Sequence, residues 1–402
     1  MSKSDNNISH TLKEYKINGQ IHMVQYTFQN LPLCILNTLR RILLSEIPII
    51  GLDLNEKESS IIENESPIHN EYLQLRIGLI PIHYRLLGDI FIDSKWNEEK
   101  NIREYKIKDA GDKKFKIKKD GSSKNSNLYK SDNTAIEITN NYVKKIEDLN
   151  ISAPNDINNL KSYVMSNDKE VSTKDITLTV GRGIDDSRFS PISYFTWEFS
   201  DNSNFENERD YTLGNKYGTD PEKVVMKIKS NHMNPSDLFK HSNYILKEKL
   251  YDLLKHKIDN TDCVYYDDTK ADHDSVVMIM KNENDTIGNI ISQIGKYYLI
   301  NEKKVVKMIT YKITHPLEND IMIRFSLDND PFILAKQMGI SYTNTDDEER
   351  YRIYKLLTTM YLKDCIKYIF KTFFNIDGKD ENDINQKIED HLGNNKEYIH
   401  WI

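Results

Sequence analysis

Acidic residues and one histidine gather near residue 270, at Asp267, Asp268, Asp272, His273 and Asp274. Oxygen and imidazole ligands of this kind can bind a metal ion when rigid elements hold them in place. The surrounding residues 259–274 show neither a helical nor a strand period. We therefore expect a solvated acidic linker here and no metal site.

The cysteines and the paired glycines also fall short of a chemical site. Cys34, Cys263 and Cys365 are far apart and form no C-x-x-C pair, which predicts neither a disulfide framework nor a cysteine-based zinc site and fits a reducing compartment. Gly181 and Gly183 could begin a phosphate-binding loop, but no G-K-[ST] follows and no helix is predicted there. With no Ser/His/Asp order and no metal triad, the sequence predicts no catalytic residue, no metal and no cofactor.

The composition is that of a polar globular protein. The chain has 402 residues, enough for two or three domains, of which 38 % are hydrophobic and 29 % charged. Its net charge is −7, whereas a free-standing protein that binds nucleic-acid phosphates usually carries a positive balance. No apolar run approaches the ~18 residues of a membrane span, and residues 1–9 are too polar for a signal peptide. We expect partners that are proteins, with DNA contacted only indirectly.

One basic stretch favours a different function. Residues 100–124 hold ten Lys and Arg residues against four acidic ones. They form either a basic loop that contacts nucleic acid or a partner, or a solvated low-complexity insertion. The scarcity of apolar residues favours the second interpretation. The first keeps open an alternative function, a free-standing nucleic-acid-binding transcription regulator.

The clearest structural pattern lies near the N-terminus. Apolar residues at steps of three and four predict an amphipathic helix, with one face formed by Leu33, Leu36, Leu39, Leu43 and Ile47. Asn37, Arg40 and Arg41 fall between these positions and point away from the apolar face. A second compact block, predicted to be rich in turns, follows at His69–Pro81.

The order of residues in Asn37–Pro48, with His69–Pro81 behind it, closely resembles the signature of the alpha-like subunits of multisubunit RNA polymerases. These are the bacterial alpha subunit, the archaeal D subunit and the third-largest subunit of nuclear RNA polymerase II. A generic core helix would explain the leucines but not N-T-L-R-R and R-I-G-L-I-P at this separation. The resemblance implies an interface with the large polymerase subunits, the helix facing the second-largest one, at Asn37, Arg40, Arg41, Arg76, Gly78, Leu79 and Pro81.

Other segments extend this resemblance. The alternating apolar residues of 10–28 predict a strand pair or one bent strand. Phe189–Ile192 resembles the Trp- or Phe-Ser-Pro-Val motif of the archaeal and nuclear subunits, with a structural turn at Ser190 and Pro191. Many of those subunits carry a cysteine cluster for zinc or iron–sulfur in an inserted domain. That cluster is missing here, so the resemblance implies no metal.

A second alpha-like unit is predicted in the C-terminal half of the chain. Glu283–Ile291 resembles the D-H-T-L-G-N signature of the small alpha-like partner, the archaeal L subunit or the eleventh subunit of RNA polymerase II. Thr286 is the expected N-cap of its helix. Tyr311–Glu318 resembles the family's Y-x-x-x-H-P-L strand and turn, with the structural turn at His315 and Pro316.

The resemblance also implies that the helices of the two units pack together. We expect this internal dimerisation contact at Leu36, Leu39, Leu43, Leu246, Leu250, Ile287, Asn289, Ile291, Leu357 and Met360. The last two lie in a long helix predicted to begin near residue 344 or 345, with Leu356 on its buried face as well.

These patterns predict an α+β protein with two alpha-like dimerisation units in one chain. The units would form an intramolecular pseudo-heterodimer, the first of them interrupted by a mainly β inserted domain. The predicted segments are 1–52 with 218–258 (first dimerisation domain), 53–217 (inserted domain, with a low-complexity loop near 97–150), 259–274 (acidic linker), 275–375 (second, eleventh-subunit-like domain) and 376–402 (C-terminal tail).

The function implied by the resemblance is a non-catalytic assembly platform of a DNA-directed RNA polymerase, whose active site lies on other subunits. The implied partners are the two largest subunits, which would associate on the platform, and a small zinc-ribbon-type subunit. No membrane and no cofactor of this chain are implied. A fusion of the two units resembles the polymerases of large cytoplasmic DNA viruses, which implies a cytoplasmic viral factory and the virion as locations, and otherwise the nucleus.

Overall fold

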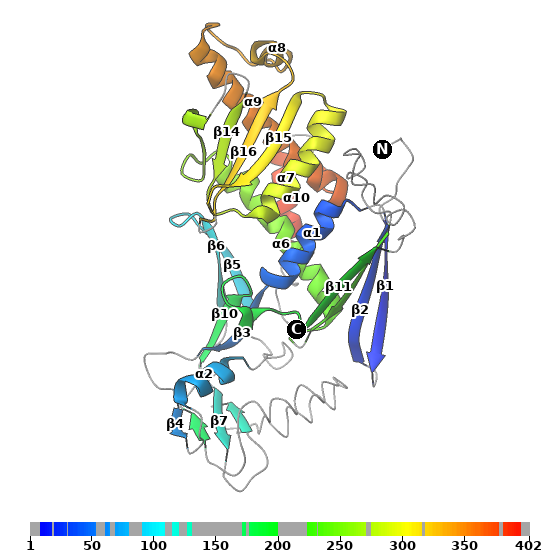
Figure 1. Cartoon of the computed structure of the whole chain (residues 1–402), viewed down its shortest axis with the longest axis vertical. Coiled ribbons are helices and arrows are strands. Elements are labelled where there is room, and N and C mark those ends of the chain that lie inside the picture. Colours follow the sequence, from blue (N-terminus) through cyan, green and yellow to red (C-terminus); the bar gives the residue numbers. More distant parts are fainter. Residues whose placement is uncertain are drawn as a thin grey trace, which may run out of the picture.

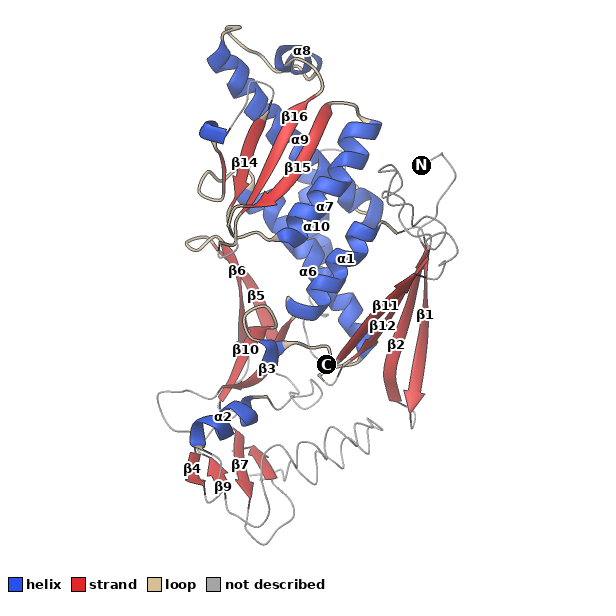
Figure 2. Ribbon diagram, viewed as in Figure 1, coloured by secondary structure: helices blue, strands red, loops and turns tan. Residues whose placement is uncertain are grey.

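Two four-stranded antiparallel sheets flank a central group of helices (Figures 1 and 2). The chain contains both helices and antiparallel strands, and the strands occur in runs that do not alternate regularly with helices, which fits the α+β class. This computed structural model describes residues 9–17, 20–29, 31–53, 61–64, 69–79, 91–108, 115–119, 127–130, 171–173, 177–199, 223–230, 232–270, 275–315, 318–377 and 381–394.

The first sheet belongs to the N-terminal half of the chain and has the strand order β1-β2-β12-β11. Its strands are β1 (Ser9–Ile17), β2 (Gln20–Gln29), β11 (Tyr194–Phe199) and β12 (Lys223–Lys229). β1 and β2 pair antiparallel, so of the two alternatives predicted for residues 10–28 the strand pair is confirmed. In β12 every second residue is buried, namely Val224, Met226 and Ile228, because one face of the strand is covered.

Two helices accompany the first sheet, α1 (Leu33–Ser45) and α6 (Pro235–Asp252). α6 begins at a capped start, because the side chain of Asn234 accepts a hydrogen bond from the Ser236 amide and Pro235 occupies the first turn. A π-helical turn, Leu253–Lys257, continues α6.

The second sheet has the strand order β13-β14-β16-β15 and belongs to the C-terminal half. Its strands are β13 (Val264–Tyr266), β14 (Val276–Met280), β15 (Val306–Ile313) and β16 (Ile321–Leu327). Its helices are α7 (Asp285–Gly295) with a π-helical continuation (Lys296–Glu302), α8 (Pro331–Gln337), α9 (Asp347–Phe374) and α10 (Glu381–Asn394).

The two halves share one topology. In each, two strands precede a helix (α1 or α7), and two further strands precede a long helix (α6 or α9). In the first sheet β12 lies between β2 and β11, and in the second sheet β16 lies in the equivalent place, between β14 and β15. α1 packs against both α6 and α7, and the buried apolar residues of both halves form one core.

The described residues between α1 and β11 form mainly strands. β3 (Pro48–Asp53) pairs with β10 (Thr177–Arg182), and β5 (Phe91–Asn97) forms a hairpin with β6 (Ile102–Lys108). A further sheet, in the order β4-β9-β7-β8, contains β4 (Ile61–Asn64), β7 (Phe115–Lys119), β8 (Asn127–Lys130) and β9 (Val171–Thr173). The helix α2 (Asn70–Gly78) contacts β3 and β4.

Four local predictions were wrong. The acidic stretch 259–274 contains β13, because Val264 is buried and pairs with Met280 of β14. The basic stretch near 97–150 contains β6, β7 and β8, at least where the structure describes it. His69–Pro81, predicted to be turn-rich, contains α2 over most of its length. The tail 376–402 contains α10, which packs against α6 through an apolar face formed by Ile384, Ile388 and Leu392.

Two helix details also differ from prediction. The N-cap of α7 is Asn284, whose side-chain oxygen accepts a hydrogen bond from the Thr286 amide at 3.0 Å, so Thr286 itself is not the cap. Leu356, expected on the buried face of α9, is 38 % exposed.

Candidate assembly surface and pairing junction

Arg40 and Asn37 lie together on the half-buried side of α1. Nε and Nη2 of Arg40 donate hydrogen bonds to Oδ1 of Asn37 at 3.0 and 2.9 Å. The guanidinium lies 5.6 Å from the ring centroid of Trp197 on β11, within cation–π range. Burial and the neighbouring charge of Arg41 lower the pKa of Arg40. The expectation that both residues contact a large subunit stays a prediction.

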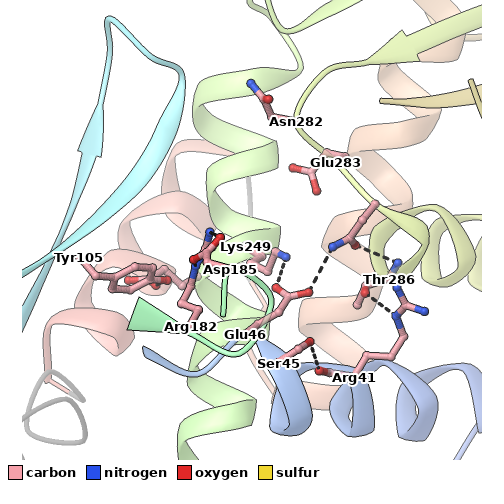
Figure 3. Close-up of polar contacts among 12 residues, drawn as sticks. Arg41, Ser45, Glu46, Tyr105, Arg182, Asp185, Lys249, Asn282, Glu283 and Thr286 are labelled. Carbon is pink, nitrogen blue, oxygen red and sulfur yellow. Dashed lines mark hydrogen bonds and ion pairs between the residues drawn. The ribbon is translucent and has the colours of Figure 1, made fainter. Parts of the chain in front are cut away.

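Arg41 points toward the C-terminal half of the chain. Its Nε donates a hydrogen bond to Oγ1 of Thr286, in the first turn of α7, at 2.9 Å (Figure 3). The sequence placed Arg41 beside Arg40 on a surface for another subunit. In the structure Arg41 contacts the second half of its own chain, and its contact with a large subunit stays a prediction.

Glu46 lies at the end of α1 and is only 4 % exposed. Its carboxylate accepts hydrogen bonds from Nζ of Lys249 on α6 and from Nδ2 of Asn284, the latter at 3.3 Å (Figure 3). Burial alone would raise the pKa of Glu46, but Lys249 and the bond from Asn284 hold that pKa below its ordinary value. One carboxylate thus joins α1, α6 and α7.

A buried ion pair links the two halves nearby. Nζ of Lys257 donates to Oε1 of Glu283 at 2.6 Å and to the backbone oxygen of Asn282 at 3.2 Å. Both side chains of the ion pair are at least nine-tenths buried. We call six residues the pairing junction: Arg41, Glu46 and Lys257 of the first half, and Glu283, Asn284 and Thr286 of the second.

The β5–β6 hairpin is fixed to α6 by charge. Arg103 binds Asp252 through two nitrogens, at 2.7 and 2.5 Å, and lies 2.9 Å from Glu248. Glu248 also accepts hydrogen bonds from Ser94 and Tyr105 at 2.8 and 3.1 Å. Burial raises the pKa of Glu248, and the two carboxylates together raise that of Arg103 despite its own burial. The β5–β6 hairpin and α10 therefore both contact α6.

α2 carries an exposed apolar stripe. Tyr72, Leu75 and Leu79 are 55, 59 and 53 % exposed and stand at steps of three and four along the helix and its end. The sequence prediction included Leu79 but missed the other two, although their spacing carried the signal. Gly78 is buried at the end of α2; the structure does not describe the side chain of Arg76, and Pro81 lies outside the described residues.

The residues predicted for internal dimerisation are mostly buried. Asn289 and Met360 are half-buried, and the others are at most 2 % exposed, namely Leu36, Leu39, Leu43, Leu246, Leu250, Ile287, Ile291 and Leu357. α1 contacts α6 and α7, and α7 contacts α9. The structure therefore places these positions in helices that pack together.

The turn residues support the end of α1. Oγ of Ser190 donates to the backbone oxygen of Leu44 at 3.0 Å, and the oxygen of Pro191 accepts from Oγ of Ser230 at 2.6 Å. A Cβ at Gly181 would lie only 2.3 Å from the ring of Phe189, so this glycine makes room for a buried aromatic residue. His315 is exposed, and Pro316 lies outside the described residues.

The acidic residues near 270 have structural contacts. Oδ1 of Asp267 caps the backbone of Thr269, and Asp268 accepts a hydrogen bond from Tyr351 and pairs with Lys355. Residues 271–274 lie outside the described part of the chain. Among the described residues, no three His, Cys, Asp or Glu side chains are grouped so that they could hold a metal ion. None of the described helices is both long and apolar enough to cross a membrane.

These features define a class, a protein in which two antiparallel sheets of the same strand order pack through their helices into one core. Residues 26–250, more than half of the chain, match the family model of the RNA polymerase Rpb3/Rpb11 dimerisation domain. The chain belongs to this family. Its dimerisation domain is a non-catalytic polymerase subunit domain, which gives the chain an assembly role and implies association with other RNA polymerase subunits.

Proposed function

We propose that this chain joins both units of an alpha-like heterodimer in one polypeptide, as a fusion of a third-largest-subunit-like unit with an eleventh-subunit-like unit. The observation that supports this most directly is the shared topology: both halves have the same order of strands and helices and the same sheet order. The family match covers the first half, and α1 packs on α7 of the second. Joining the units raises the effective concentration of the second to roughly the millimolar range, so pairing needs no separate partner.

The proposed role is a platform on which the two largest subunits of a DNA-directed RNA polymerase associate. The exposed apolar stripe of α2 supports this role, because exposed apolar patches rimmed by polar residues mark interaction sites. Arg40 adds a guanidinium that can bridge carboxylates or carbonyl oxygens across an interface. A small zinc-ribbon-type subunit is a further proposed partner. The proposal includes a large cytoplasmic DNA virus as the source and the viral factory and virion as locations.

One cation of the basic stretch, Arg103, is used for contacts within the chain, and Lys106 lies on its exposed side. Arg103 is paired with Glu248 and Asp252, and Lys106 lies 3.2 Å from Glu104. Arg103 therefore forms ion pairs within the chain and is not available to bind phosphates.

Affinity capture tests the proposal. A tagged full chain is expressed where its polymerase is made, and the captured polypeptides are identified by mass spectrometry. We expect both large catalytic subunits in amounts comparable to the bait. Capture without them, together with salt-sensitive binding of the purified chain to duplex DNA, would instead support the transcription regulator.

A further inference from the structure

The apolar part of the contact between the halves does not determine which two units pair. Leu36, Leu39 and Leu43 on α1, and Ile287 and Ile291 on α7, are each at most 2 % exposed. Burial of such surface stabilises in proportion to area and does not distinguish one aliphatic face from another. Because the two halves share one topology, two first halves from different copies could bring equivalent helices together in the same way. Something else must favour the unlike pair.

The pairing junction can distinguish the two units, because its side in the first half differs chemically from its side in the second half. The first half contributes two cations, Arg41 and Lys257, and the second half contributes the acceptors that they meet, Thr286 and Glu283. Glu46 reverses the roles, since it accepts from Asn284 of the second half. Each contact across the junction therefore joins two different residue types.

The starts of α1 and α7 show what a like pairing would lose. Asn284 is the N-cap of α7, with Glu283 just before it, whereas the N-cap of α1 is Pro32, which makes no side-chain cap, with Leu31 just before it. In a pairing of two first halves, Leu31 would therefore stand where Glu283 stands. The ammonium of Lys257 would be buried without a carboxylate, an arrangement that is strongly disfavoured.

The position of Lys257 depends on a local departure from α-helical geometry. Leu253–Lys257 is a π-helical turn, in which the amide of Ile258 donates to the oxygen of Leu253 at 3.0 Å. The wider turn leaves Lys255 exposed and Lys257 buried against Glu283. π-Helical turns of this kind are frequent at functional positions.

We infer that the pairing junction is the specificity determinant of this chain: it admits a helix start with a carboxylate before a polar N-cap and rejects pairing between two first halves. The partner it fits is the α7 end of a second unit, with Glu283, Asn284 and Thr286. This inference rests on the proposed pairing of two units. The inference predicts that the chain is a monomer when it is not assembled in its polymerase.

The main test replaces the ion pair by apolar residues in the full chain, Lys257→Met with Glu283→Met. This double variant leaves no charge unpaired, and flexible methionines fill the space, so its thermal midpoint should stay close to that of the parent. Sedimentation over a wide range of concentration should show a monomeric parent and a variant that self-associates at least about tenfold more strongly, which corresponds to about 1.4 kcal/mol. The control, Lys303→Gln with Asp364→Asn, removes an ion pair within the second half and should remain monomeric.

A charge reversal provides a second arm. Lys257→Glu and Glu283→Lys should each lower the thermal midpoint and promote self-association, and the two together should restore a monomer. A strictly monomeric Met double variant, its unfolding, or a double reversal no better than either single change would overturn the inference. None of these measurements involves the polymerase. A failed capture of the large subunits would therefore count against the proposed function alone.

Discussion

Glu46 holds a buried charge at the point where three helices meet. Glu46→Gln should lower the free energy of unfolding by about 2–4 kcal/mol, because Lys249 loses its partner in a largely shielded position. The pKa of Glu46 in the folded state is below its ordinary value of 4.5. The ion pair therefore contributes fully above about pH 4.5, and the contribution is lost as the pH falls through the lowered pKa.

Chemical denaturation at neutral pH and at a series of acidic pH values measures this contribution. The difference between the parent and Glu46→Gln should shrink once the pH falls below 4.5. Glu198→Gln, which removes an exposed partner of Lys227, serves as the control and should leave unfolding unchanged. A difference that stays constant down to strongly acidic pH would contradict a charged Glu46.

Arg40 and Arg41 are adjacent but should behave differently. Arg41→Ala removes a donor to Thr286 and should cost about 1 kcal/mol of stability. Arg40→Ala should change stability by only about ±0.5 kcal/mol, as for other partly exposed positions, yet weaken capture of the second-largest subunit. Thermal unfolding combined with affinity capture separates the two roles. Equal capture by Arg40→Ala and the parent would remove Arg40 from the interface.

At the scale of elements, the apolar pattern of the sequence predicted α1 and the extended structure of β1 and β2, because each has one regular apolar period. It missed β13, which is three residues long and surrounded by acidic residues. It also missed α10, whose apolar residues Ile384, Ile388 and Leu392 recur at helical spacing in a polar stretch. Short elements depend on their neighbours in space, which no local pattern contains.

The β5–β6 hairpin depends on Arg103. Arg103→Ala would leave Glu248 and Asp252 close together with no cation between them, at side-chain exposures of 2 and 7 %. We expect a loss of about 3–5 kcal/mol and faster cleavage of the hairpin by proteases. Denaturation and limited proteolysis report the two effects. Lys106→Ala on the exposed side of β6 is the control, and a hairpin equally protected in both variants would contradict this role.

The stripe on α2 should matter for docking and not for folding. Leu75→Glu changes an exposed side chain, so stability should stay within about ±0.5 kcal/mol of the parent. Capture of a large subunit should fall, because a charge would enter an apolar contact. The matched control is Ile333→Glu on α8, because Ile333 is 54 % exposed in the parent. This variant should capture the large subunit as well as the parent does. Equal loss in both variants would show that the α2 stripe is not special.

At the scale of the whole molecule, the core is shared between the halves. Leu39→Asp places an unpaired charge among buried residues of α1, α6 and α7, so both halves should lose stability in one transition. Leu12→Asp, on an exposed position of β1, should have little effect. Calorimetry measures whether the two halves unfold in one transition and at what temperature. Independent melting of the C-terminal half in the Leu39→Asp variant would show that the halves do not depend on each other.

The pairing junction could not be predicted from the sequence. Arg41 and Thr286 are 245 positions apart, and Glu46 and Lys249 are 203 apart. Resemblance to known motifs marked the helices that carry these residues, but not the direction of each side chain. That direction follows from how α1, α6 and α7 cross, which depends on both sheets.

The place of β12 in the first sheet has a consequence for synthesis on the ribosome. β12 lies between β2 and β11, yet it is translated after the whole inserted region, beginning at Lys223. At about 5–20 residues per second, roughly 10–40 s pass between the end of β2 and the arrival of β12. During that time an edge of β2 has no partner strand, and α1 has neither α6 nor α7 to cover its leucines. The nascent chain should therefore engage chaperones that bind exposed apolar segments, and slower translation of the insertion should lower the yield of folded protein.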